Sequence, residues 1–216
     1  MFPFDKIRKI IYNICMERIF TADDIIDCVN EYGILPFWVE DGFSAWQLSG
    51  VSFMKLWNMR EKAINSKKLA YGKFVNKKST FVSLEAFPYL CALRRDGYDF
   101  DSLSDEGRAP RREIELMNAV GTEPTRSYKL KQTLNLKGFD GVVTSLQNKT
   151  YLCLTFEKSY MGTAMLSRPE DVLGYDYVRS AYNLSVEENA AKLLELCKGL
   201  YEFDEKTRAK ILSPAV

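Results

Sequence analysis

Residues Thr125–Leu173 read TRSYKLKQTLNLKGFDGVVTSLQNKTYLCLTFEKSYMGTAMLSRPEDVL, and this stretch decides the predicted fold. Thr125 is a suitable cap for a first helix, and residues 136–138 are expected to form a tight turn because Gly138 tolerates left-handed backbone angles. A second helix follows, in which the apolar residues 139, 142, 143 and 146 have the i, i+3, i+4, i+7 spacing of a buried stripe. Residues 150–156 and 163–166 are expected to be two strands of a hairpin. Helix, turn, helix and hairpin in this order are typical of a winged helix-turn-helix.

The second helix is the predicted recognition element, because this fold presents such a helix to the major groove of double-stranded DNA. We expect its polar side to be open to solvent. Between Gly121 and Glu170 the chain has seven basic and four acidic side chains, a mild excess over a whole-chain charge of +1. Winged helices also serve as protein-binding modules, so this alternative stays open. The predicted nucleic-acid contacts are Lys129, Lys131, Lys137, Thr144, Ser145, Gln147, Asn148, Lys149 and Lys158.

The rest of the chain predicts an α+β protein that is rich in helices. Phe4–Ile19 and the segment that starts at Thr21 have the pattern of helices, and residues 34–38 are an apolar connector. Residues 69–74 and 80–83 are expected to form a second hairpin, whose lysines either meet phosphate or protect a sheet edge. The predicted parts are an N-terminal region (1–108), the winged-helix module (109–174) and C-terminal helices (175–216), which we expect to pack as one unit.

Composition excludes several classes of function. The chain of 216 residues has no histidine, so catalysis by a serine–histidine or cysteine–histidine pair and metal sites with histidine ligands are excluded. The five cysteines, Cys15, Cys28, Cys91, Cys153 and Cys197, are far apart and lie among apolar residues, so reduced core thiols of a cytoplasmic protein are expected. No signal peptide or membrane span is expected, and no cofactor is predicted.

Two other segments have both a functional and a structural interpretation. The aromatic residues between Trp46 and Trp57 could stack on a nucleic-acid base, although a core cluster is the more common role. Residues 94–107, RRDGYDFDSLSDEG, are rich in carboxylates but lack the glycine and the final glutamate of a calcium loop. A structural role, in which Asp96 or Asp99 pairs with Arg94 or Arg95, is therefore favoured over a metal site.

Several motifs resemble those of the AlkZ-related family of bacterial proteins. They are YGKF, the run KKSTFVS, FP and RRDGYDFD within residues 70–109, followed by GFDGVVTSLQNKTYLCLTFE and SRPEDVLG. The resemblance extends from about Tyr32 to Leu200, and RRDGYDFD is its most specific part. AlkZ is a winged-helix DNA glycosylase that removes alkylated and crosslinked purines. The resemblance therefore implies a winged-helix architecture and DNA binding.

The resemblance does not include the complete catalytic motif of the glycosylases. The glycosylases have a Q-x-Q motif at the lesion, whereas this chain has Gln147-Asn148-Lys149, which retains one glutamine. Gln147 is therefore a weak catalytic candidate, and no carboxylate can be assigned to stabilise the sugar cation that base excision requires. The sequence predicts a DNA-binding or DNA-damage-related protein. The alternatives are a glycosylase-like enzyme that excises alkylated bases and a protein-interaction module without enzymatic activity.

Overall fold

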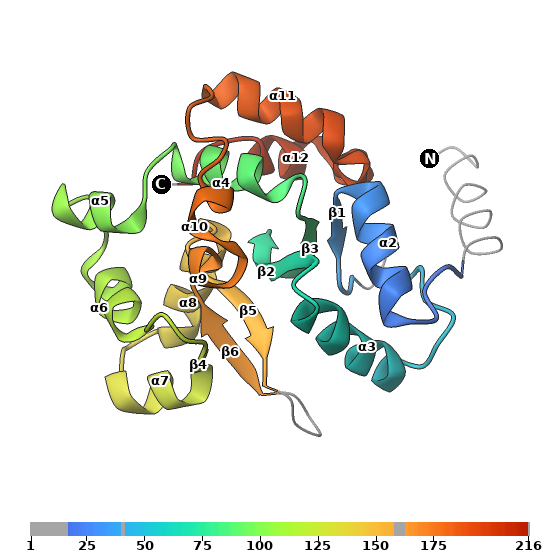
Figure 1. The fold of residues 1–216 in the computed structure, drawn as a ribbon, viewed down its shortest axis with the longest axis horizontal. Coiled ribbons are helices and arrows are strands. Elements are labelled where there is room, and N and C mark those ends of the chain that lie inside the picture. The colour runs from blue at the N-terminus through green and yellow to red at the C-terminus, as the bar shows by residue number, and fades with distance from the viewer. Residues whose placement is uncertain (1–16, 40–41, 158–162, 216) are drawn as a thin grey trace.

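The computed structural model describes residues 17–39, 42–157 and 163–215. The helix predicted for Phe4–Ile19 lies almost wholly outside the described residues, as do Cys15 and Lys158. The protein has an α+β fold, in which helices surround two three-stranded antiparallel sheets (Figure 1).

The first sheet is built from the N-terminal part of the chain. Helix α2 (Ala22–Tyr32) starts at the predicted cap, where the Thr21 hydroxyl accepts from the Asp24 N–H and the Asp24 carboxylate accepts from the Thr21 N–H. After β1 (Ile34–Pro36) and α3 (Phe53–Asn65), strands β2 (Leu69–Val75) and β3 (Lys78–Ser83) form the predicted hairpin, and the sheet order is β1-β3-β2. Residues 34–36 are thus a strand and not a connector, because they pair with β3 and are buried.

The middle of the chain contains the predicted helices and hairpin. Its helices are α4 (Phe87–Arg95), α5 (Phe100–Asp105), α6 (Arg111–Ala119), α7 (Ser127–Leu134) and α8 (Phe139–Asn148). Its strands are β4 (Thr125–Arg126), β5 (Cys153–Phe156) and β6 (Ala164–Ser167), in the order β4-β6-β5. Thr125 does not cap α7, since it pairs with Leu166 in the sheet. Part of the carboxylate-rich loop is helix α5, and Asp99 pairs with Arg179 at 3.3 Å and not with Arg94 or Arg95, because Arg95 is directed to Glu170.

The C-terminal part is helical. It consists of α9 (Pro169–Leu173), α10 (Tyr175–Val178), α11 (Val186–Leu196), the 3₁₀ helix η1 (Lys198–Glu202) and α12 (Glu205–Ile211). The capping box predicted at Ser185 and Glu188 is present at the start of α11.

The two sheets meet in the middle of the molecule. Helices α2 and α3 lie beside the first sheet, α6, α7 and α8 lie beside the second, and α11 and α12 run along one end (Figure 1). Strand β2 contacts both β5 and α8, so the first hairpin reaches the helix pair that the sequence singled out. Cys28, Cys91, Cys153 and Cys197 are free and buried, as expected. Among the described residues no helix is long and apolar enough to cross a membrane.

Candidate nucleic-acid interface

Two residues with left-handed backbone angles precede helix α8. Gly138 before it has a φ of 77° and Asn135 has a φ of 45°, so both lie in the left-handed region and turn the chain between α7 and α8. The apolar stripe is as predicted: Phe139, Val143 and Leu146 are buried in a cluster with residues of α5, α6 and the second sheet. The orientation of α8 is therefore determined by its apolar side.

The polar side of α8 is not open along its whole length, so this expectation is wrong at the C-terminal end. Gln147 is 1% exposed, and its Oε1 accepts the backbone N–H of Lys73 in β2 at 2.7 Å. The Asn148 amide donates to the carbonyl of Phe74 at 3.1 Å and accepts from Arg94. The physical reason is that both amides pair with main-chain groups of β2, and that Asn148 also accepts from the buried guanidinium of Arg94.

Ser145 and Lys149 lie one turn apart on α8, and both bind the same carboxylate. The Ser145 hydroxyl donates to Oε1 of Glu113 at 2.7 Å, and the Lys149 ammonium is 3.0 Å from Oε2. Glu113 lies in α6 and is buried. The charge of Lys149 is thus balanced inside the protein, although its side chain still borders the surface.

The other predicted lysines are at the surface. Lys131 pairs with Asp140 at 2.6 Å, while Lys129 and Lys137 are exposed. Thr144 donates to the carbonyl of Asp140 at 2.7 Å and lies 3.4 Å from the ammonium of Lys73.

A groove runs along the part of α8 that remains accessible. Its volume is about 620 Å³. One wall is α8, and the other is made by the turn between β2 and β3 and by the segment that includes Lys210 and Ala215. The turn is held in place, because the Asn76 amide donates to the Thr207 hydroxyl in α12 at 2.8 Å. The lining residues are Asn76, Lys77, Asp140, Gly141, Thr144, Ser145, Asn148, Lys149, Lys210 and Ala215.

The groove brings together two basic regions that are separate in sequence. Lys77 and Lys210 line it, and Lys73 reaches its wall at Thr144. None of these three lysines has an ion pair with a carboxylate of the described residues, in contrast to Lys131 and Lys149. Of the nine predicted contact residues, Thr144, Ser145, Asn148 and Lys149 line the groove.

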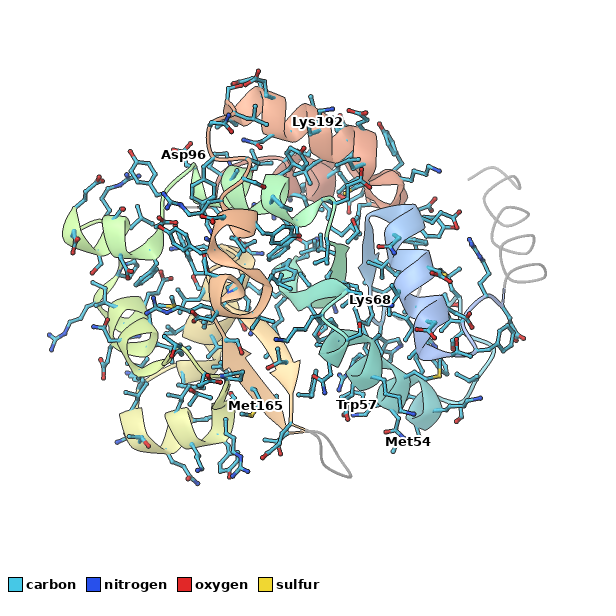
Figure 2. All side chains as sticks on the ribbon, in the orientation of Figure 1. Met54, Trp57, Lys68, Asp96, Met165 and Lys192 are labelled. Carbon is cyan, nitrogen blue, oxygen red and sulfur yellow. The ribbon has the colours of Figure 1, made fainter. Side chains whose placement is uncertain are left out.

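The nine predicted contacts did not include Asn76, Lys77 or Lys210, although contact with phosphate was one of the two roles considered for the hairpin lysines. The lysines of the β2–β3 hairpin were a usable signal, since residues 67–78 contain five lysines and no acidic side chain. Lys210 had no such signal, because only the folding of α12 against the turn brings it to the groove. Lys68 (Figure 2) directly precedes β2, whereas Lys77 is in the turn between β2 and β3, so the two lysines belong to opposite ends of the hairpin.

The aromatic residues of α3 and its surroundings form a cluster with a buried arginine. The guanidinium of Arg60 lies 3.6 Å from the ring centroid of Trp57 and 4.5 Å from that of Phe156. One face of Trp57 is therefore covered by Arg60, while Met54 on the same helix is 60% exposed (Figure 2).

Within the described parts of the chain, no group of histidine, cysteine and carboxylate side chains could hold a metal ion.

The chain was compared with known proteins and protein families. No curated protein and no solved structure matches it significantly. The model of one family, described as AlkZ related, matches residues 19–213, which is a longer stretch than the motifs alone indicated. This match covers both sheets and all the described helices from α2 to α12, and the chain therefore belongs to the AlkZ-related family.

Proposed function

We propose that this protein binds DNA through the groove along α8. The observation that supports the proposal is the convergence on the groove of three lysines without a carboxylate partner among the described residues: Lys77 and Lys210 line the groove, and Lys73 reaches its α8 wall at Thr144. Ammonium groups are the main contacts of proteins to nucleic-acid phosphates. Since the whole chain has a net charge of only +1, binding must come from such a local concentration of charge.

Family membership favours DNA as the ligand, because the family is named after a DNA glycosylase. It does not extend to catalysis at Gln147. The amide of Gln147 is enclosed between α8 and β2 and does not line the groove. We therefore propose binding, within a winged-helix arrangement of α6, β4, α7, α8, β5 and β6, as the function that the geometry supports best.

Salt dependence of binding tests the proposal. Fluorescence anisotropy of a labelled DNA should give an affinity that falls with rising salt, with a log–log slope of about −0.9 for each phosphate neutralised. The double variant Lys77→Ala/Lys210→Ala should bind more weakly and reduce the magnitude of the slope by about 2.

The matched control is Lys55→Ala/Lys62→Ala. Both lysines are exposed on α3, and the double variant loses the same net charge away from the groove. Equal loss of affinity in the two double variants would contradict the assignment of the groove. Absence of DNA binding at low salt would reject the proposed function and favour a module that binds protein.

A further inference from the structure

The side chains of α8 that are suited to reading bases are already occupied. Asparagine and glutamine recognise adenine through a pair of hydrogen bonds from the side-chain amide. In this protein the Gln147 carbonyl oxygen accepts from Lys73, and the Asn148 amide both donates to Phe74 and accepts from Arg94. Gln147 cannot turn toward a base without leaving the N–H of Lys73 without its acceptor, and Asn148 cannot do so without losing its hydrogen bonds to Phe74 and Arg94.

The remaining polar groups of α8 have little power to select a base. The hydroxyl hydrogens of Thr144 and Ser145 point to acceptors within the protein, the carbonyl of Asp140 and the carboxylate of Glu113. Asp140 could accept from a cytosine amino group, but its carboxylate is paired with Lys131 at 2.6 Å. The ammonium groups at the groove without a carboxylate partner in the described parts of the chain are those of Lys77 and Lys210, which line it, and of Lys73, which contacts the Thr144 hydroxyl; they suit phosphate and carry no base preference.

The surroundings of α8 also oppose its insertion into a major groove. A helix enters that groove, which is about 12 Å wide, when it projects from the protein surface. Here α8 is itself one wall of a groove, and the opposite wall is the β2–β3 turn with Lys210 and Ala215. Asn76 and Lys77 have φ values of 46° and 61°, so they form a tight turn, and the bond from Asn76 to Thr207 ties this turn to α12. A duplex placed at the groove side of α8 would therefore also lie against this turn.

We infer that the groove receives the sugar-phosphate backbone of a nucleic-acid strand and binds it without regard to base sequence. The inference rests on the proposed function and specifies the chemical class that the groove recognises. The strand is either the backbone ridge of a duplex or a single strand, because both present the same phosphodiester chain. Contacts come from the lysines, and α8 acts as a supporting wall and not as a reading element.

Two measurements on the unmodified protein test the inference. Selection of bound molecules from a random DNA pool should enrich no sequence motif. An oligonucleotide in which neutral methylphosphonates replace the phosphates should bind at least about tenfold more weakly than the natural oligonucleotide of the same sequence, because several charge contacts are lost.

An enriched motif that binds more than about tenfold tighter than a scrambled sequence would overturn the inference, since each recognised base pair contributes a factor of this size or more. Retained affinity for the neutral backbone would overturn it as well. With either result the protein still binds natural DNA, so the proposed function stands and only the inference about the backbone is rejected. If the protein binds no DNA at all, the proposed function is rejected. Parallel titrations with single-stranded and duplex DNA identify the source of the strand, and preference for either one is consistent with the inference.

Discussion

Arg94 and Arg95 are adjacent in α4 and both are buried, but their charges are compensated in different ways. Arg95 pairs with the carboxylate of Glu170 and donates to Thr150 and to the Tyr182 hydroxyl. Arg94 has no ion pair among the described residues, and it donates to the main-chain oxygens of Asn148, Lys210 and Ser213. Burial lowers the pKa of Arg94 to about 10. The two arginines of the RRDGYDFD motif therefore have a structural role, because they join distant parts of the chain.

The pair between Arg95 and Glu170 should contribute strongly to stability. Replacement of Glu170 with glutamine removes the counter-charge of a guanidinium that has no exposed surface, and this should lower the free energy of unfolding by about 3 kcal/mol. Urea denaturation monitored by circular dichroism measures the change. Glu106→Gln is the control, because Glu106 pairs with Arg108 at the exposed surface and should change stability by less than about 1 kcal/mol. Similar effects of the two substitutions would contradict the prediction.

Asp24, the carboxylate of the capping box at the start of α2, should make stability depend on pH in the acidic range. Hydrogen bonds from the backbone N–H of Phe20, and from Thr21, lower the pKa of Asp24 in the folded protein. Because the folded-state pKa lies below the unfolded value of about 3.9, the stabilisation is present above this pH and is lost as the pH falls through the folded-state pKa. Asp24→Asn should therefore reduce the loss of stability between about pH 5 and pH 2. Urea midpoints measured across this range test the prediction, and parallel curves for both proteins would refute it.

At the scale of elements, α8 is joined to two neighbours by polar contacts as well as by its apolar stripe. Gln147 and Asn148 fasten it to β2, and Ser145 and Lys149 fasten it to Glu113 in α6. Polar groups that are satisfied in this way define a single orientation of the helix, because any rotation leaves several of them buried and unpaired. This attachment encloses the C-terminal end of the helix, so that α8 is accessible where it borders the groove.

The contact between Gln147 and β2 can be tested directly. Gln147→Leu leaves the N–H of Lys73 without an acceptor, so we expect a loss of about 2 kcal/mol in the free energy of unfolding. Hydrogen exchange of the Lys73 amide should become faster. Gln147→Glu keeps a side-chain oxygen that can accept, and it should preserve more of the protection. Unchanged exchange at Lys73 in Gln147→Leu would show that the hydrogen bond does not form in solution.

At the scale of the whole molecule, several contacts cross the boundaries of the three regions that the sequence suggested. Gln147 reaches Lys73, Arg94 reaches Lys210, and Arg95 reaches Glu170. Each contact buries a polar or charged group whose partner lies in another region. Separation of the regions would expose or unpair these groups, so we expect the regions to unfold together.

A single unfolding transition is the corresponding prediction. The three tryptophans, Trp38, Trp46 and Trp57, all lie in the N-terminal region, whereas helices occur in all three regions. Tryptophan fluorescence and far-ultraviolet circular dichroism should therefore give the same midpoint in urea. Two separate midpoints would show that the N-terminal region unfolds independently.

The sequence by itself determined the elements and several of their boundaries. The caps at Thr21 and Ser185, the hairpin of β2 and β3, and the helix pair α7 and α8 depend on neighbouring residues, so local spacing was sufficient to predict them. Membership of the AlkZ-related family could also be inferred from motifs. The strand β1 was missed, because its short apolar run is defined by its pairing with β3.

Only the tertiary structure decided which side chains of the candidate site are available. Gln147 and Lys73 are 74 positions apart, and Lys149 and Glu113 are 36 apart, so no local pattern indicates that these groups are mutually satisfied. The same holds for Lys210, which reaches the groove because α12 packs against the β2–β3 turn. Electrostatic pairing depends on distance in space, and the packing of the apolar stripes determines that distance.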